Sequence, residues 1–351
     1  MLAKRVSELP PDGGWIFEPK WDGFRTLVFR DGAELFIQSR DEKPLDRYFP
    51  ELVEALKKQL PKRCVLDGEI VIAQDGRLEF DLLQHRLHPA ASRVKMLSEK
   101  TPASVVFFDL LAHGAKSLCK TPFAERRAAL EKLLGDAEPP IHVTPATRDR
   151  KTAADWFKRF EGAGLDGVMA KGESGTYEPN KRVMLKVKHE RDADCVVGGF
   201  RWHKDRKDTA VGSLLLGLYT DDGDLAHVGV CASFSDVKRR ELVDFLAPYR
   251  TNAIDKHPWK EWAAMMEESG GAGGASRRPG MGNRWNVGKD MSWVPIRPEL
   301  VVQIAYDHMQ GDRFRHTAQF RRWRPDKKPG SCTFDQLEVV PPLELKEIFG
   351  A

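Results

Sequence analysis

The sequence predicts an α+β fold in its first half, in which antiparallel sheets are joined by helices, and a small β-barrel in its second half. Two observations support this division. Up to about residue 188, strand-like stretches alternate with stretches of helical spacing. From about residue 192 onward, short strand-like stretches and turns dominate. We therefore expect two domains, residues 1–190 and 191–351, in this chain of 351 residues.

The strands of the first domain are predicted from β-branched and aromatic residues, and its helices from apolar residues three and four positions apart. Asp-Gly turns at Asp31-Gly32 and Asp75-Gly76 bound several of the strands. The expected strands are residues 15–17, 25–30, 34–38, 65–73 and 105–110, and the expected helices are residues 49–56, 121–134 and 151–161.

The second domain is predicted from several short strands and a single helix, a pattern that suits a small barrel such as an oligonucleotide-binding (OB) fold. The expected strands are residues 195–200, 213–219, 225–230 and 300–306, and the helix is residues 235–246. The glycine-rich stretch 269–276 reads as a flexible loop inside this domain.

Composition indicates a cytoplasmic protein without a membrane span, because no stretch approaches the roughly 18 apolar residues of such a span and no signal-peptide core follows the first residues. The five cysteines are scattered without a C-x-x-C pair, which argues against a disulfide framework or a zinc site. The net charge is only +4, but cations gather at residues 181–191 and 311–328. These two runs are either solvated faces or contacts for a phosphate-rich partner, and their pairing favours the partner.

Lys20 follows the expected strand 15–17 and is succeeded by Asp22 and Gly23, which suit a tight turn that phosphates can approach. A lysine attacks phosphorus only as a neutral amine, whereas an ordinary lysine pKa near 10.4 leaves roughly one amine in a thousand neutral at pH 7. Desolvation, nearby cations or a metal ion lower such a pKa. Lys20 is thus a candidate nucleophile, and the alternative is a solvated turn lysine.

Five further segments carry groups that a nucleotidyl-transfer site needs. Acids are rarely buried alone, so a carboxylate in an apolar strand suggests a hydroxyl, metal or lysine partner. Two lysines on one face of a strand suggest an anion between them. The candidates are Arg40 for a phosphate, Glu69 as that carboxylate, Phe108 for stacking on a base or as a core residue, Asp166 for Mg²⁺, and Lys186 with Lys188 for the anion.

In this order, Lys20-Trp21-Asp22-Gly23, Ser39-Arg40, Asp67-Gly68-Glu69, Phe108-Asp109, residues 166–171 and Lys186-Val187-Lys188 resemble the ordered motifs of the covalent nucleotidyltransferases. Residues 315–327 resemble the last motif of ATP-dependent DNA ligases, carried on their OB domain. Within that superfamily the chain is most similar to the compact bacterial ATP-dependent ligases of the repair and end-joining type. It departs from many relatives in having Asp at position 166, where they have Glu.

The resemblance implies that Lys20 attacks the α-phosphate of ATP to form a lysyl-AMP, that AMP passes to the 5′-phosphate of a nick, and that the 3′-hydroxyl then seals the strand. It implies Mg²⁺ as the metal, with Mn²⁺ as an alternative. Implied roles are Glu18 accepting from the adenine 6-amino group, Phe108 stacking on adenine, Glu69 and Arg25 at the ribose, Arg40 at the nick 5′-phosphate, Lys171, Lys186 and Lys188 at the nucleotide, Glu69 and Asp166 at the metal, and Arg324, Asp326 and Lys327 at the pyrophosphate.

The last of these roles requires the second domain to close over ATP, so a hinge is expected near residues 188–192. The implied partner is nicked duplex DNA, contacted mainly through phosphates by residues 202–207 and 276–279. A monomer that works at the nucleoid, with DNA-repair or end-joining proteins as partners, is expected. Three alternatives stay open: an RNA ligase, an mRNA-capping guanylyltransferase that uses GTP, and an inert nucleic-acid-binding module.

Overall fold

The computed structural model describes residues 1–262, 292–338, 340–341 and 343–349. The glycine-rich stretch 269–276 and the predicted DNA contact 276–279 lie outside these residues. The chain divides into two compact units, one formed by Met1–Lys188 with Val340–Ala351 and the other by His189–Val339. The expected second domain, residues 191–351, differs from this division at its end, because the last residues pack with the first unit.

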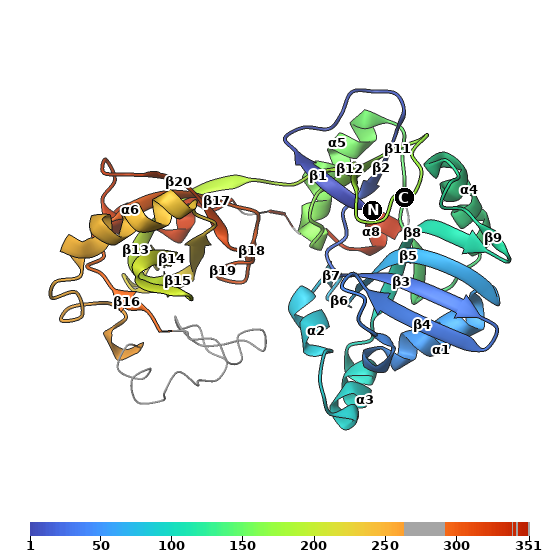
Figure 1. Ribbon diagram of the computed structural model, residues 1–351, viewed down its shortest axis with the longest axis horizontal. Helices are drawn as coiled ribbons and strands as arrows, with labels where there is room; N and C mark the ends of the chain where they lie inside the picture. The colour runs from blue at the N-terminus through green and yellow to red at the C-terminus, as the bar shows by residue number, and fades with distance from the viewer. Residues whose placement is uncertain (263–291, 339, 342, 350–351) are drawn as a thin grey trace. The chain divides into compact units, whose positions relative to one another are not determined.

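A four-stranded sheet of the first unit holds the segments that surround Lys20 (Figure 1). Its order is β1 (Leu2–Val6), β12 (Arg182–Val187), β11 (Val168–Gly172) and β2 (Trp15–Pro19). β1 pairs with β12 in parallel, whereas the other neighbours are antiparallel. Lys20 leaves the sheet at the end of β2, and Lys186 lies near the end of β12.

The first unit contains a second sheet, of six strands. Its main path is β10 (Ile141–Val143), β8 (Ser104–His113), β5 (Arg63–Val71), β3 (Phe24–Asp31) and β4 (Glu34–Ser39), and β9 (Lys116–Ser117) pairs with β8. Arg25 on β3 pairs in register with Glu69 on β5, so both side chains lie on one face. The first unit also contains the helices α1 (Pro50–Gln59), α2 (Phe80–His85), α3 (Ala91–Lys100), α4 (Phe123–Leu134) and α5 (Arg150–Arg159).

Two apolar clusters support these sheets. One joins strands β3, β5 and β8 to α1 and α4, through residues such as Val28, Leu56 and Leu130. The other contains Phe17 and Trp21, which bracket Glu18 and Lys20, and packs them against α5. Asp149 begins α5 by accepting hydrogen bonds from the backbone N–H groups of residues 151 and 152, as a good helix N-cap does.

The end of the chain completes the second of these clusters. Leu345 and Ile348, in and next to α8 (Lys346–Phe349), are buried against it, and the N–H of Leu345 donates to the carbonyl of Gly76 at 2.7 Å. The backbone approach is so close that a Cβ on Gly162 would lie 2.1 Å from the carbonyl oxygen of Pro341. Figure 1 shows α8 beside the strands of the first unit.

In the second unit, five strands close into a ring. These strands are β13 (Arg191–His203), β14 (Arg206–Tyr219), β15 (Leu225–Ala232), β20 (Ala318–Trp323) and β17 (Val301–Tyr306), and β14 closes the ring by pairing with β13. The short strand β16 (Val294–Pro295) pairs with β13, and β18 (Met309–Gln310) pairs with β19 (Arg313–Phe314). Trp259 fills the core, and its indole N–H donates to the carbonyl of Leu225 at 2.6 Å.

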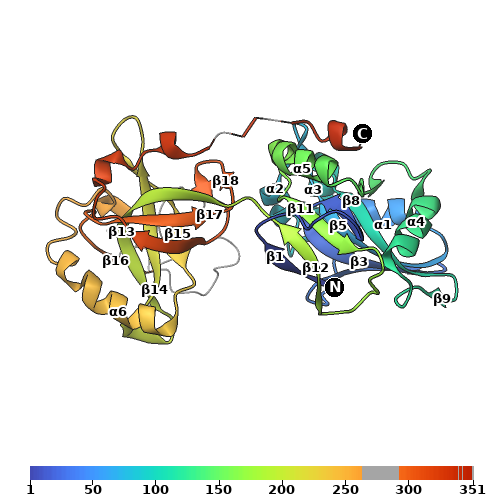
Figure 2. The ribbon, with the colours of Figure 1, turned by 90° about the horizontal axis from the view of Figure 1, so that it is seen from above.

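Helix α6 (Asp236–Leu246) lies along the outside of this ring (Figure 2). Ser235 caps it by accepting from the N–H of Lys238, at the start that the sequence predicts. The predicted fold class, an α+β domain followed by an OB-like β domain, is confirmed. Among the described strands, three pairings are parallel: β1 with β12, β8 with β10 and β15 with β20. The sequence led us to expect antiparallel sheets only.

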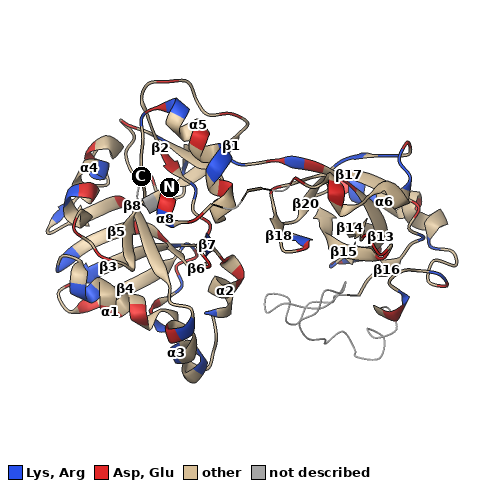
Figure 3. Ribbon diagram, turned by 180° about the vertical axis from the view of Figure 1, so that it is seen from behind, with Lys and Arg blue, Asp and Glu red and all other residues tan. Residues whose placement is uncertain are grey.

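All five cysteines are free thiols. Among the described residues, no helix combines the length and the apolar character needed to cross a membrane. Figure 3 shows that both units carry Lys and Arg interspersed with Asp and Glu. Part of the basic run 311–328 is neutralised within its own unit, since Arg321 pairs with Glu190 and Arg324 with Asp194.

Candidate active site

Lys20 is held by backbone hydrogen bonds that fix the turn after β2. Its N–H donates to the carbonyl of Gly167 at 2.8 Å, and its carbonyl accepts from the N–H of Asp166 at 2.9 Å. Gly167 has φ +109°, and a Cβ there would lie 2.0 Å from the carbonyl oxygen of Val187. Only glycine fits this close packing of three strand ends. The segments before β11, after β2 and at the end of β12 therefore converge on one point.

Asp166 contacts two lysines through a single oxygen. Its Oδ2 lies 2.6 Å from Nζ of Lys20 and 2.9 Å from Nζ of Lys188. The Asp166 side chain is only 5% exposed. Burial by itself would raise the pKa of Asp166, but the charges and hydrogen bonds of the two lysines outweigh it and lower the pKa. The carboxylate is thus kept ionised between two amines.

Lys186 adds a third amine to this end of the sheet. It lies opposite Met169 in the β11–β12 pair, one residue before the end of β12. Burial lowers the pKa of Lys186, and the positive charges of Lys20 and Lys188 lower it further. Three amines close enough to repel one another form an anion-binding surface, as the sequence suggests for Lys186 and Lys188.

Glu69 lies on the opposite sheet and faces the same turn. Its Oε1 accepts from the N–H of Gly23 at 3.1 Å. Burial raises the pKa of Glu69 to about 7, although the charges of Lys20 and Arg25 act in the other direction. Gly23 permits this contact, since a Cβ at that position would lie 2.1 Å from the carbonyl oxygen of Ile70. Lys20 therefore interacts with two carboxylates, Asp166 and Glu69.

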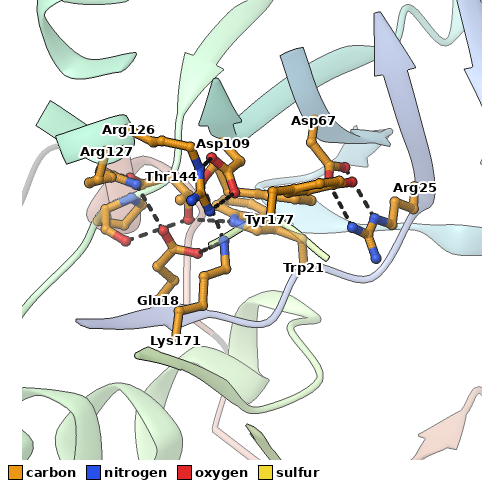
Figure 4. A network of polar contacts seen from close by, with 12 residues as sticks. Glu18, Trp21, Arg25, Asp67, Asp109, Arg126, Arg127, Thr144, Lys171 and Tyr177 are labelled. Atoms are coloured by element: carbon orange, nitrogen blue, oxygen red, sulfur yellow. Dashed lines mark hydrogen bonds and ion pairs between the residues drawn. The ribbon is translucent and has the colours of Figure 1, made fainter. Parts of the chain in front are cut away.

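Glu18 belongs to a buried network of ion pairs (Figure 4). Its carboxylate is only 2% exposed and accepts from Lys171 at 2.7 Å and from Arg127 at 3.1 Å. Arg127 also donates to the carbonyl of Thr144, whose hydroxyl accepts from the indole N–H of Trp21 at 2.7 Å. The sequence predicts that Glu18 accepts from adenine, but both of its oxygens are already engaged by cations.

Phe108 lies beside this network and is partly exposed, whereas its neighbour Phe107 is completely buried. The Nζ of Lys171 is 4.4 Å from the centre of the Phe108 ring, within cation–π distance. The guanidinium of Arg25 is 5.8 Å from the same centre. Of the two readings of Phe108 from the sequence, this placement favours a site residue over a core residue.

Arg25 is held by Asp67 through two hydrogen bonds, at 3.1 Å from Nε and 2.6 Å from Nη2. A second bidentate pair links Arg126 on α4 to Asp109 on β8 at 2.8 and 2.9 Å. Both carboxylates are 1% exposed, so they depend on donors within the protein, among them these arginines. Arg40 lies elsewhere, exposed in the turn after β4.

The three predicted residues of the last motif are brought together in the second unit. Arg324 forms hydrogen bonds to Asp326, the shortest at 2.7 Å, and to both oxygens of Asp194 at 2.9 and 3.0 Å. Lys327 lies 3.6 Å from the same Asp194. The hydrogen bonds from Arg324 to Asp326 lower the pKa of Asp326 to about 2. Asp194 on β13 organises the cluster.

The sequence did not indicate Asp194, Arg126, Arg127 or Tyr177 as site residues. Asp194 follows the basic run in a strand-like stretch, which by itself suggests only an exposed position. Arg126 and Arg127 are adjacent on the face of α4 that buries Leu130. A charged pair at apolar helix positions is the one signal that could have indicated buried partners.

The fold and the site together define a nucleotidyltransferase with a following OB-like domain. A family model described as "ATP dependent DNA ligase domain" matches residues 1–188, and one described as "ATP dependent DNA ligase C terminal region" matches residues 207–327. The chain belongs to the ATP-dependent DNA ligases.

Similar proteins agree with this assignment. The chain is 58% identical to DNA ligase C2 of Mycolicibacterium smegmatis, over 97% of this chain and 94% of that protein. It is 55% identical to DNA ligase C of Mycobacterium tuberculosis, over 99% and 96%. A solved structure from a study of Lig E DNA ligases shares the fold, with a TM-score of 0.54 and 17% identity over 92% of this chain and all of that one. The chain is therefore close to the compact bacterial C-type ligases.

Proposed function

We propose that the chain seals nicks in duplex DNA through a covalent AMP on Lys20. The observation that supports this most is that Oδ2 of Asp166 lies 2.6 Å from Nζ of Lys20 and 2.9 Å from Nζ of Lys188. Phosphoryl transfer requires positioning and charge neutralisation more than acid–base chemistry, and three amines with two carboxylates supply both.

The reaction consists of three transfers. Nζ of Lys20 forms a bond to the α-phosphorus of ATP as the bond to the bridging oxygen breaks, which releases pyrophosphate. An oxygen of the 5′-phosphate at the nick then takes the AMP from the lysine. Finally the 3′-hydroxyl attacks the 5′-phosphorus, AMP leaves, and a phosphodiester remains.

The residues around Lys20 take roles according to their positions. Lys186 and Lys188 bind the α-phosphate, and Arg25 and Glu69 address the ribose. Adenine stacks on the face of the Phe108 ring opposite Lys171. Glu18 holds Lys171 in place by their ion pair. The Glu18 carboxylate accepts from the adenine 6-amino group when one of its two cations is displaced.

Two groups of residues act outside this centre. Arg40 holds the nick 5′-phosphate. Arg324, Asp326 and Lys327 orient the pyrophosphate, for which the second unit closes by a hinge near residues 188–192. The boundary between the units, between Lys188 and His189, falls in that range.

Glu69 and Asp166 fit a hard divalent cation, Mg²⁺ or the alternative Mn²⁺. Among the described residues no cluster of three or more metal-binding side chains occurs, and Mg²⁺ commonly uses only one or two carboxylates together with phosphates and water. Bound there, the cation would neutralise charge on the phosphates.

The DNA is proposed to lie against the β13–β14 hairpin, where Lys204 is 84% exposed, and against residues 276–279. Contacts to phosphates would make binding independent of sequence and sensitive to salt. We place the chain in the bacterial cytoplasm at the nucleoid, as a monomer that repairs DNA with repair or end-joining proteins as partners. The support for a monomer is that one chain carries every proposed reactive group.

The test is the formation of a labelled adduct. The wild-type chain, incubated with Mg²⁺ and α-labelled ATP or GTP, should acquire label from ATP alone, and Lys20→Ala should acquire none. Lys57→Ala, which changes an exposed lysine on α1, is the control. An adduct that survives in Lys20→Ala refutes the nucleophile, and label from GTP supports the capping alternative. Nicked DNA and nicked RNA duplexes then separate a DNA ligase from an RNA ligase.

A further inference from the structure

Tyr177 connects the two sheets of the first unit. It lies in the loop between β11 and β12, the two strands that carry Lys171 and Lys186. Its hydroxyl donates to Oδ2 of Asp67 on β5, in the six-stranded sheet, at 2.9 Å. Its backbone N–H donates to the carbonyl of Cys119 at 2.8 Å, which fixes where the loop passes. A hydrogen bond thus spans from the phosphate-binding side of the site to the opposite sheet.

Asp67 depends on Tyr177 for part of its hydrogen bonding. The carboxylate is 1% exposed, and its Oδ2 accepts both from Nη2 of Arg25 at 2.6 Å and from Tyr177. Burial, and then the charge of Asp67, raise the pKa of Tyr177, so the phenol remains a donor at all working pH values. Removal of the hydroxyl would leave Oδ2 with Arg25 as its side-chain donor.

The same loop is also held from the other side. Arg126 donates to the carbonyl of Gly175 at 3.1 Å, and its guanidinium lies 5.9 Å from the centre of the Tyr177 ring. Figure 4 shows Tyr177 between the Arg126–Asp109 pair and the Arg25–Asp67 pair. Contacts therefore fix both the ring and the hydroxyl of Tyr177. The hydroxyl in turn fixes the position of the Asp67 carboxylate.

We propose that Tyr177 is a positioning residue for the nucleotide, which holds Asp67 and through it sets the guanidinium of Arg25 beside Phe108. This inference rests on the proposed nucleotide site, in which Arg25 addresses the ribose. Tyr177 acts through Asp67 and Arg25 and takes no part in the transfer itself. Loss of the Tyr177 hydroxyl should weaken ATP binding and reduce discrimination between ribose and deoxyribose nucleotides. Lys20 and its neighbours should keep their arrangement.

The experiment measures the single-turnover rate of lysyl-AMP formation by the full chain against the concentration of ATP, 2′-deoxy-ATP or 3′-deoxy-ATP. Here KM is the concentration that gives half of the maximal rate, and kcat is the maximal rate constant. In Tyr177→Phe, KM for ATP should rise about tenfold, the effect of one hydrogen bond to a charged group, while kcat stays within about twofold. The ratio of kcat/KM for ATP to kcat/KM for each deoxy nucleotide should become smaller. Tyr48→Phe, which also removes a hydroxyl in the first unit, should leave both quantities unchanged.

The outcomes separate the inference from the function on which it rests. A Tyr177→Phe enzyme with the wild-type KM and the wild-type sugar preference overturns the inference. An equal loss in kcat with all three nucleotides also overturns it, because that result indicates a general structural role. If Arg25→Ala leaves both KM and the sugar preference unchanged, the proposed ribose site fails, and the role of Tyr177 fails with it. If Tyr177→Phe melts early, Asp67→Asn tests the same link and should give the same rise in KM.

Discussion

The Nζ atom of Lys20 lies 2.6 Å from Oδ2 of Asp166, the oxygen that Lys188 also contacts. A lysine attacks phosphorus only as a neutral amine, so the ammonium form of this ion pair has to lose a proton before the first transfer. Phosphate oxygens compete for the two lysines, and a divalent cation would compete for the carboxylate. Asp166 therefore holds Lys20 in place until the nucleotide arrives.

We predict that Asp166→Asn slows lysyl-AMP formation by about 10²-fold, since the variant loses the negative charge between two amines and one ligand proposed for the metal. Asp166→Glu should keep more activity than Asp166→Asn, because it keeps the negative charge and the carboxylate oxygens. Single-turnover labelling with ATP measures the rate. Asp155→Asn, in an exposed pair on α5, is the control. Full activity in Asp166→Asn would show that the carboxylate has no part in the first transfer.

For the last motif, we predict that Lys327→Ala slows lysyl-AMP formation more than it slows sealing of a nick that already carries AMP. The reason is that the proposed contact is to pyrophosphate, which takes part only in the first transfer. Lys328→Ala, which changes the adjacent exposed lysine, is the matched control. Lysyl-AMP formation is followed with α-labelled ATP, and sealing is followed with labelled DNA that already carries AMP at the nick. An unchanged first step in Lys327→Ala would contradict closure of the second unit over ATP.

In the C-terminal segment, Leu345→Ala and Ile348→Ala should each lower the free energy of unfolding of the first unit by about 2–5 kcal/mol, the usual cost of a large cavity in a core. Both side chains belong to the apolar cluster that contains Phe17 and Trp21. Denaturant unfolding followed by tryptophan fluorescence measures the change. Lys346→Ala, at a side chain that is 77% exposed, should change it by less than about 0.5 kcal/mol. Equal stability of all three variants would show that the segment does not support the core.

The second unit should lose stability as the pH falls below the ordinary histidine range. Burial, and then the charges of Arg313 and Arg201, lower the pKa of His227 from 6.5 to about 3. Between these values the unfolded chain binds a proton that the folded chain does not, so His227 stabilises the fold above pH 6.5 and this contribution is lost toward pH 3. The slope approaches about 1.4 kcal/mol per pH unit. The melting temperature should depend less on pH in His227→Gln than in the wild type between pH 6.5 and pH 3. An unchanged dependence would exclude His227 as the cause.

The sequence predicted the longest strands of both units and the helices α1, α4, α5 and α6, because their apolar patterns are local. Helix α6 begins at its Ser235 cap, and β3 and β4 flank the Asp31-Gly32 turn. The strand β1 was not predicted, since residues 2–6 alternate poorly and gain their structure from β12, about 180 positions later. Long-range pairing of this kind leaves no mark on a short window of sequence.

The site was predictable to the extent that single residues define it. Lys20, Glu69, Asp166, Lys186 and Lys188 meet as their motifs suggest. Their supports were not predictable, because Arg127 reaches Glu18 from α4 and Tyr177 reaches Asp67 from a loop. Such contacts follow from how the two sheets pack, which no local pattern encodes.

The packing of Leu345 and Ile348 into the cluster around Trp21 also sets the order in which the chain can fold during its synthesis. The segment that contains Lys20 is made first, yet its supporting cluster is incomplete until residues 343–348 have left the ribosome. The β-barrel unit lies between these segments in sequence, and its described strands end at Trp323. A nascent chain can therefore complete the barrel first, and the catalytic unit reaches its final packing once residues 343–348 have been made.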